Sequence, residues 1–194
     1  MTALADRLRA SLGAPPAIPP LEGDLPERRA NASSEAAVLI AITDRSEPGV
    51  LLTVRREDLR THAGQIAFPG GRIDPGEDAF QAALREAHEE ILLDPAAAEV
   101  VGSIEPYRTV TGYVVTPVIA VIPPDLPLTP QEREVAELFE APLAYLLDPQ
   151  NQRRESALFQ GHEHHYYEIV WNGRRIWGAT AAMIVNLSRR LQWH

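Results

Sequence analysis

The sequence predicts a chain of the α/β (α+β) class in which helices pack against a mixed β-sheet. Segments rich in Val and Ile alternate along the chain with segments whose apolar residues recur at helical spacing, and this interleaving is typical of that class. Of the 194 residues, 45% are hydrophobic and 23% are charged, which is the balance of a folded globular protein. The length suits one domain with a short extension.

The extension comes first. Three leucines recur at every fourth position: Leu4, Leu8 and Leu12. This spacing predicts a short amphipathic helix that ends at Gly13. Five prolines within residues 14–26 then force an extended path. We therefore expect residues 1–34 to form a helix and a proline-rich arm packed on a domain that spans residues 35–194.

Six segments of the domain have strand character, with β-branched residues and turn residues at their ends. They are residues 36–43, 50–55, 100–107, 113–122, 164–171 and 174–177. Asn172 and Gly173 separate the last two strands and predict a two-residue hairpin turn. Residues 56–71 contain glycines and show no sustained period, so we expect a loop there.

Three segments are expected to be helical: residues 74–92, 132–147 and 179–191. The first is the strongest of the three. Asp74 can cap its start, Pro75 fits the first helical position, and Glu77 occupies the acidic position of a capping box.

The helix expected over residues 74–92 has two contrasting faces. One stripe is apolar and holds Phe80, Leu84, Ala87 and Ile91. The opposite face carries glutamates at spacing i, i+3 and i+4, so that their carboxylates converge: Glu86, Glu89 and Glu90. Spacing alone allows either a solvated acidic surface or a site for Mg²⁺ or Mn²⁺, which prefer oxygen ligands.

The residues around these glutamates favour the metal site. From Gly71 to Leu93 the chain resembles the Nudix box, Gly-x5-Glu-x7-Arg-Glu-U-x-Glu-Glu-x-Gly-U, where U is a bulky aliphatic residue. Leu92 replaces the last glycine of the box, and Ala87 is small for its position. Because that glycine would serve a left-handed cap, its loss should alter how the helix ends without removing any acid.

The resemblance continues upstream of the box. Residues 51–71 are similar to the signature of the coenzyme A pyrophosphatase subfamily, Leu-Leu-Thr-x-Arg-Ser-x3-Arg-x3-Gly-x3-Phe-Pro-Gly-Gly, and depart from it only where Arg56 replaces the serine. Residues 176–181 also look like the C-terminal stretch of that subfamily. The resemblance implies the Nudix fold, a mixed sheet sandwiched between helices.

It also implies a metal-dependent pyrophosphatase. The metal ligands would be the three glutamates of the box and the carbonyl of the residue before it: Glu86, Glu89, Glu90 and Gly70. Arg85 and Glu77 would form a supporting pair that orients the helix. The catalytic candidates are Glu86 and Glu89 of the box and Glu134. Glu86 is the first candidate for general base, and Glu134, which lies later in the chain, is the alternative. The plainer interpretation of Glu134 is an exposed acid on a helix.

The implied substrate is coenzyme A, cleaved to 3′,5′-ADP and 4′-phosphopantetheine. The substrate-binding candidates are Arg55, Arg60, Gly64 and Phe68. The two arginines could grip the 3′-phosphate through forked hydrogen bonds. The alternative is that they are surface arginines paired to Glu57 and Asp58. Other Nudix substrates, such as ADP-ribose or a dinucleotide, stay open, whereas the intact box acids disfavour a non-catalytic binding domain.

The charge limits the partners further. The formal net charge is −9, which argues against nucleic acid and an anionic membrane surface as partners. Five acidic residues and one basic residue lie between positions 77 and 90, so two Mg²⁺ ions would cancel the local charge.

The absence of cysteine excludes disulfides and a thiol nucleophile. With no signal-peptide pattern and no apolar run of roughly 20 residues, a cytoplasmic protein is expected. The sequence makes no prediction about oligomeric state.

Overall fold

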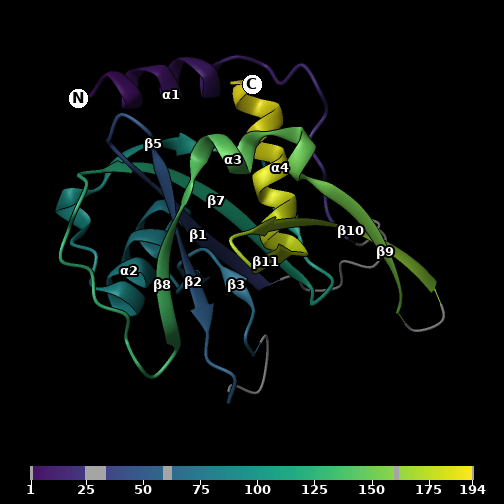
Figure 1. The fold of residues 1–194 in the computed structure, drawn as a ribbon. Helices are drawn as coiled ribbons and strands as arrows, with labels where there is room; N and C mark the ends of the chain where they lie inside the picture. The colour runs from purple at the N-terminus through teal and green to yellow at the C-terminus, as the bar shows by residue number, and fades with distance from the viewer. Residues whose placement is uncertain (1, 25–33, 59–62, 160–161, 194) are drawn as a thin grey trace.

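The computed structural model describes residues 2–24, 34–58, 63–159 and 162–193. The helices are α1 (Ala3–Gly13), α2 (Ala79–Ile91), α3 (Leu143–Leu147) and α4 (Ala179–Leu191), with short 3₁₀ turns η2 (Pro95–Ala97) and η3 (Pro149–Asn151). The strands are β1 (Ser34–Thr43), β2 (Gly49–Arg55), β3 (Ile66–Ala67), β4 (Gly70–Arg72), β5 (Glu99–Ser103), β6 (Tyr107–Arg108), β7 (Tyr113–Ile122), β8 (Val135–Pro142), β9 (Arg153–Phe159), β10 (His162–Trp171) and β11 (Arg174–Trp177) (Figure 1).

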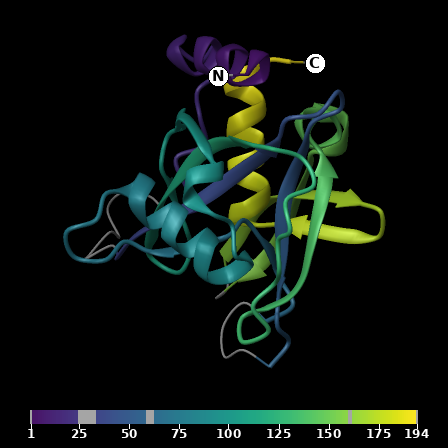
Figure 2. The same ribbon diagram turned by 90° about the vertical axis from the view of Figure 1, so that its left-hand side faces the viewer.

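The larger sheet is mixed and lies between helices, as predicted. Its main path runs β3-β2-β1-β7-β5, and β4, β6 and β8 pair with β1, β7 and β2. β1 and β7 are parallel over their whole length, and the remaining pairs are antiparallel. Alternate residues of β1 face opposite sides, so that Leu39 packs with α2, and Ile40 packs with α1 and α4. Figure 2 shows α2 and α4 on either side of this sheet.

The second sheet, ordered β11-β10-β9, contains the predicted hairpin. Asn172 and Gly173 have φ values of 48° and 76°, the left-handed pair that a two-residue turn of this type requires. β9 was missed in the sequence, because its Arg-Arg-Glu start gives no apolar alternation. β9 and β10 project from the body of the molecule in both views (Figures 1 and 2).

The helix predicted over residues 132–147 is wrong in its first two thirds. Residues Val135–Pro142 form β8, and only Leu143–Leu147 are helical. Ala, Glu and Leu give this segment helical propensity, but antiparallel pairing along β2 buries Val135 and Ala141 and outweighs that propensity. Pro142, which precedes α3 directly, is the local signal against one continuous helix.

The start of α2 also differs from the prediction. Its N-cap is Asp78, whose side chain and that of Gln81 form the capping box. Asp74 and Glu77 instead close a turn, in which the Glu77 N–H donates to the Asp74 carbonyl at 3.0 Å. Phe80, expected in the core, is 38% exposed. The residues of α2 that are buried are Ala82, Ala83, Ala87, Glu90 and Ile91.

The end of α2 keeps the left-handed cap that the box glycine would provide. Leu92 has a φ of 55° and a ψ of 31°, and its N–H donates to the His88 carbonyl. The prediction that the helix would end differently is therefore wrong. The leucine adopts a glycine conformation at an energetic cost.

The N-terminal segment lies against α4. Ala5 and Leu8 are fully buried in the core that contains α4. The side chain of Asn186 accepts a hydrogen bond from the backbone N–H of Leu21 at 2.7 Å and donates to its carbonyl at 2.9 Å. Arg189 donates to the Pro19 carbonyl at 2.7 Å. Within the described part of the chain, no helix is long and apolar enough to span a membrane.

Candidate functional site

The three glutamates of α2 lie in three different environments. The side chain of Glu89 is 58% exposed, that of Glu86 is 16% exposed and that of Glu90 is 5% exposed. The sequence placed Glu90 on the face opposite the apolar stripe, and this prediction is wrong. Glu90 follows Ala83 and Ala87 at i+7 and i+3, and this spacing places it on the buried stripe of the helix.

Glu90 meets the loop that precedes the helix. Its Oε2 accepts a hydrogen bond from the Gly70 N–H at 3.3 Å, and its Oε1 lies 3.7 Å from Nη1 of Arg55. Burial raises the pKa of Glu90 to about 7, and the charges of Glu86 and Glu134 add to the rise. The carboxylate is thus buried with only partial compensation of its charge.

Glu86 packs against Gly71. A Cβ atom at residue 71 would fall far inside van der Waals distance of the Glu86 carboxylate, so glycine makes room for it. A Cβ atom at Gly70 would meet the backbone of Ala37 and Val38. Burial raises the pKa of Glu86, although Nη1 of Arg85 donates to its Oε1 at 2.9 Å. The Gly-Gly pair therefore lets β4 approach both β1 and the acidic helix.

Arg85 connects most of the acidic groups around the helix. Its Nε and Nη2 donate to the two carboxylate oxygens of Glu77 at 2.8 and 3.0 Å, a bidentate pair that lowers the pKa of Glu77. Its Nη1 also reaches Glu89 at 3.4 Å, and its Nη2 donates to the Arg72 carbonyl at 3.0 Å. Arg85 and Glu77 are thus placed together by two hydrogen bonds.

Glu134 reaches the same cluster from a distant part of the chain. It is exposed and ends a turn directly before β8. Its charge contributes to the raised pKa values of Glu86 and Glu90. The backbone holds the turn in place, because the N–H of Gln131 donates to the Glu90 carbonyl at 2.8 Å.

The substrate-binding candidates have mixed placements. Arg55 faces Glu90, and its Nε is buried without a hydrogen-bond partner among the described residues. Gly64 has a left-handed φ of 67°, and its N–H donates to the Arg55 carbonyl at 3.1 Å. Phe68 is 3% exposed and belongs to the hydrophobic core. Arg60 lies outside the described residues.

The sequence also allowed Arg55 to be a surface arginine paired to Glu57 or Asp58, and the structure pairs it differently. Asp58 pairs with Arg56 at 2.7 Å, and the partner of Arg55 is Glu90. Arg55 is therefore oriented toward the acidic helix and not toward its sequence neighbours.

The donor set fits a hard divalent cation. In residues 2–24, 34–58, 63–159 and 162–193, no group of three or more His, Asp or Glu side chains is already arranged around one metal position. Glu86 and Glu89 are instead paired to Arg85. However, Glu86, Glu90 and Glu134 supply only carboxylate oxygens and repel one another, and a cation of the Mg²⁺ or Mn²⁺ type would relieve that repulsion.

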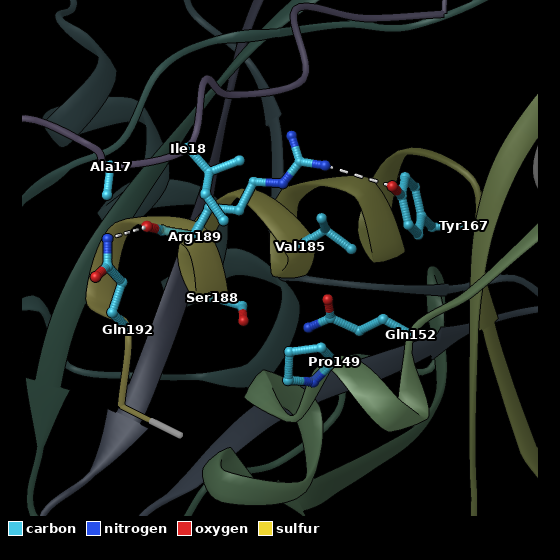
Figure 3. Close-up of a pocket in the computed structure, with 9 residues that line it drawn as sticks. All are labelled: Ala17, Ile18, Pro149, Gln152, Tyr167, Val185, Ser188, Arg189 and Gln192. Atoms are coloured by element: carbon cyan, nitrogen blue, oxygen red, sulfur yellow. Dashed lines mark hydrogen bonds between the residues drawn. The ribbon is translucent and has the colours of Figure 1, made fainter.

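A cavity of about 360 Å³ lies elsewhere, between the proline-rich arm and α4 (Figure 3). Its polar side chains are engaged within the protein. Ser188 donates to the Leu147 carbonyl at 2.6 Å, Gln152 donates to the Leu146 carbonyl at 2.9 Å, and Arg189 contacts the Tyr167 hydroxyl at 3.4 Å. The cavity borders α4, on the other side of the larger sheet from the acidic helix.

Comparisons with known proteins agree with the geometry. The family described as NUDIX domain matches residues 33–170. "Uncharacterized Nudix hydrolase NudL" of Escherichia coli (strain K12 / DH10B) is 45% identical over 158 residues, which cover 81% of this chain and 82% of that protein. The protein of the same name from Shigella boydii serotype 4 has the same identity and coverage. The crystal structure of a Nudix hydrolase from M. Smegmatis, RenU, is 29% identical with a TM-score of 0.50, covering 57% of this chain and 71% of that chain.

Proposed function

This chain belongs to the Nudix family of pyrophosphohydrolases, and we propose that its substrate is coenzyme A, cleaved to 3′,5′-ADP and 4′-phosphopantetheine. The observation that carries the proposal is the orientation of Arg55. This residue belongs to the segment that resembles the coenzyme A pyrophosphatase signature, and its guanidinium lies 3.7 Å from the buried carboxylate of Glu90. A cation so close to the acids can bind a phosphate of a substrate whose pyrophosphate lies over them.

The metal ligands in this proposal are Glu86, Glu89, Glu90 and the carbonyl of Gly70. Their oxygen donors suit Mg²⁺ or Mn²⁺. When bound there, such an ion would neutralise charge on the phosphate oxygens and favour ionisation of the attacking water. Glu89 would have to exchange its contact with Arg85 for the metal, which its exposure permits.

The protein supplies the proton acceptor for the attacking water. Glu86 is the first candidate, since its side chain is largely buried and burial raises its pKa. Glu134 is the alternative, since its turn is bonded to the Glu90 carbonyl through the Gln131 N–H and its charge acts on Glu86 and Glu90. Arg85 and Glu77 would keep the acidic face of α2 in one orientation through their bidentate contact.

The substrate side would be formed by Arg55, Arg60 and Gly64. Arg55 has a buried Nε without a partner among the described residues, so it retains a donor for an anion such as the 3′-phosphate. Gly64 has a left-handed φ, and its N–H donates to the Arg55 carbonyl, so the glycine shapes the backbone beside Arg55. Phe68 would act from the core, by supporting the loop.

The experiment compares substrates directly. The protein is incubated with Mg²⁺ and, in separate reactions, coenzyme A, ADP-ribose, a dinucleotide and a nucleoside triphosphate. We expect coenzyme A to have the highest kcat/KM, and we expect Arg55→Ala to reduce kcat/KM for coenzyme A more than for dephospho-coenzyme A, which lacks the 3′-phosphate. Cleavage of ADP-ribose or a dinucleotide with coenzyme A left intact would assign the alternative substrate class.

A further inference from the structure

Arg56 departs from the subfamily signature, which has a serine at this position, and its side chain is fully engaged. Its Nε and Nη2 donate to the two carboxylate oxygens of Asp58, both at 2.7 Å. Its Nη1 donates to the backbone carbonyl of Glu132. Its own backbone N–H donates to the carbonyl of Glu134 at 3.1 Å. Arg56 therefore joins the loop after β2 to the turn before β8.

That turn is anchored at two places. On one side, it bonds to carbonyls at the end of the acidic helix: the Thr129 N–H donates to Ile91 at 3.0 Å and the Gln131 N–H donates to Glu90 at 2.8 Å. On the other side, the contacts come from Arg56. Figures 1 and 2 both show the start of β8 beside the end of β2. The position of Glu134 relative to the acidic helix thus depends on both anchors.

The regular strand pairing stops where Arg56 begins. The β2–β8 register shifts between Val54 and Arg55, and the pair of Arg55 with Val135 is the last of the ladder. Beyond this point, the hydrogen bonds of Arg56 to the carbonyls of Glu132 and Glu134 connect the two segments. A guanidinium is needed here, because one planar group must donate to a carboxylate through one edge and to a carbonyl through another. A serine hydroxyl has one donor hydrogen and cannot make both contacts.

We infer that Arg56 is a positioning residue, which holds the turn of residues 131–134 so that the Glu134 carboxylate faces Glu86 and Glu90. This inference rests on the proposed role of Glu134 in pyrophosphate hydrolysis. The plainer view is that Arg56 forms an exposed ion pair with Asp58, which would contribute little. The two views differ in what they expect for turnover.

The test measures kcat and KM of Arg56→Ser and Arg56→Lys. Arg45→Ser is the matched control, since the side chain of Arg45 is 36% exposed against 40% for Arg56. Arg45 forms its ion pairs elsewhere, with Asp125 and Glu140. Because misplacement of a reacting group by about 1 Å can cost up to 10²-fold in rate, we expect both Arg56 variants to lose about tenfold or more in kcat. KM should change less than about twofold, since substrate binding is not altered.

Two further readouts separate positioning from folding. Hydrogen exchange should become faster in residues 129–135 of Arg56→Ser and stay unchanged in α4. In a Glu134→Gln background, Arg56→Ser should have no further effect on kcat, because the group that it positions is already lost. A loss in kcat that persists in that background would overturn the inference, and so would an Arg56→Ser turnover within twofold of Arg45→Ser.

The substrate does not enter this comparison. If coenzyme A is left intact and ADP-ribose is cleaved, the proposed substrate is wrong. The same variants measured on ADP-ribose then decide the role of Arg56.

Discussion

The Glu90 carboxylate accepts a hydrogen bond from the backbone N–H of Gly70 across 3.3 Å. This contact joins the buried stripe of α2 to the loop that would carry the substrate phosphates. It also explains why a charged residue is placed where an aliphatic one would be expected. The acid is 5% exposed and is met by one backbone N–H and by Arg55 at 3.7 Å, which leaves its charge only partly compensated.

A first prediction concerns the stability of the metal-free protein. The folded pKa of Glu90 is about 7 against an ordinary value of 4.5, so the folded state binds the proton more tightly than the unfolded chain. The contribution of Glu90 to the free energy of unfolding should therefore be fully present below pH 4.5. This contribution should fall by on the order of 3 kcal/mol as the pH rises through 7. Chemical denaturation in EDTA between pH 5 and pH 8 measures this change.

Glu90→Gln is the control for that experiment, because glutamine does not ionise. Its stability should be nearly flat over the same pH range, whereas addition of Mg²⁺ or Mn²⁺ should stabilise only the protein that has Glu90. A parallel pH dependence in both proteins would contradict the assignment to Glu90.

Gly70 and Gly71 should respond differently to substitution by alanine. In Gly71→Ala, the added Cβ meets the end of the flexible Glu86 side chain, which can move away. We expect a loss of up to about 10²-fold in kcat with a stability change below about 1 kcal/mol. In Gly70→Ala, the Cβ meets the backbone of Ala37, which cannot move, and we expect destabilisation by about 2–3 kcal/mol. Denaturation and steady-state kinetics of both variants give the comparison, and equal loss of stability in the two would be inconsistent with it.

Leu92→Gly should stabilise the protein. Leu92 has a left-handed φ of 55°, a conformation that costs a non-glycine residue about 1–2 kcal/mol. Glycine removes this cost, but its greater conformational freedom in the unfolded chain offsets part of the gain in stability. A net gain of about 0.5–1 kcal/mol is expected from the denaturation midpoint. Gln192→Gly tests the same effect at the end of α4, where φ is 52°. A destabilised Leu92→Gly would mean that contacts of the leucine side chain outweigh its backbone strain.

Arg85→Lys should reduce turnover while the charge is kept. The guanidinium holds both oxygens of Glu77 and also reaches Glu86 and Glu89, and an ammonium group cannot form this set of contacts. We expect kcat to fall by about tenfold or more, with little change in the far-UV spectrum. Full turnover by Arg85→Lys would show that the contacts of the guanidinium are dispensable.

Much of the fold could be predicted from local patterns. The strand over residues 113–122 and the helix over residues 179–191 have the predicted bounds, and the Asn172-Gly173 turn has the predicted geometry. β8 could not be found this way, because its strand conformation depends on pairing with β2, at least 80 positions earlier in the chain, and not on its own propensity.

The candidate site shows the same division. The motif spacing predicted that Glu86, Glu89 and Glu90 lie on one helix, and in the structure Arg85 contacts Glu86 while Gly70 contacts Glu90. It could not show that Glu90 is buried, because the width of the apolar stripe depends on how α2 sits against the sheet. The role of Arg56 was also hidden, since its contacts in the turn before β8 exist only after β8 pairs with β2.

The most direct test of the account is the identity of the products formed from coenzyme A in the presence of Mg²⁺. Mass spectrometry of the wild-type reaction should show 3′,5′-ADP and 4′-phosphopantetheine in equal amounts. When the water is labelled, one ¹⁸O atom should enter the product whose phosphorus is attacked, and the other product should stay unlabelled. Glu86→Gln should yield neither product at a comparable rate. Intact coenzyme A under conditions in which another nucleoside diphosphate derivative is hydrolysed would contradict the account.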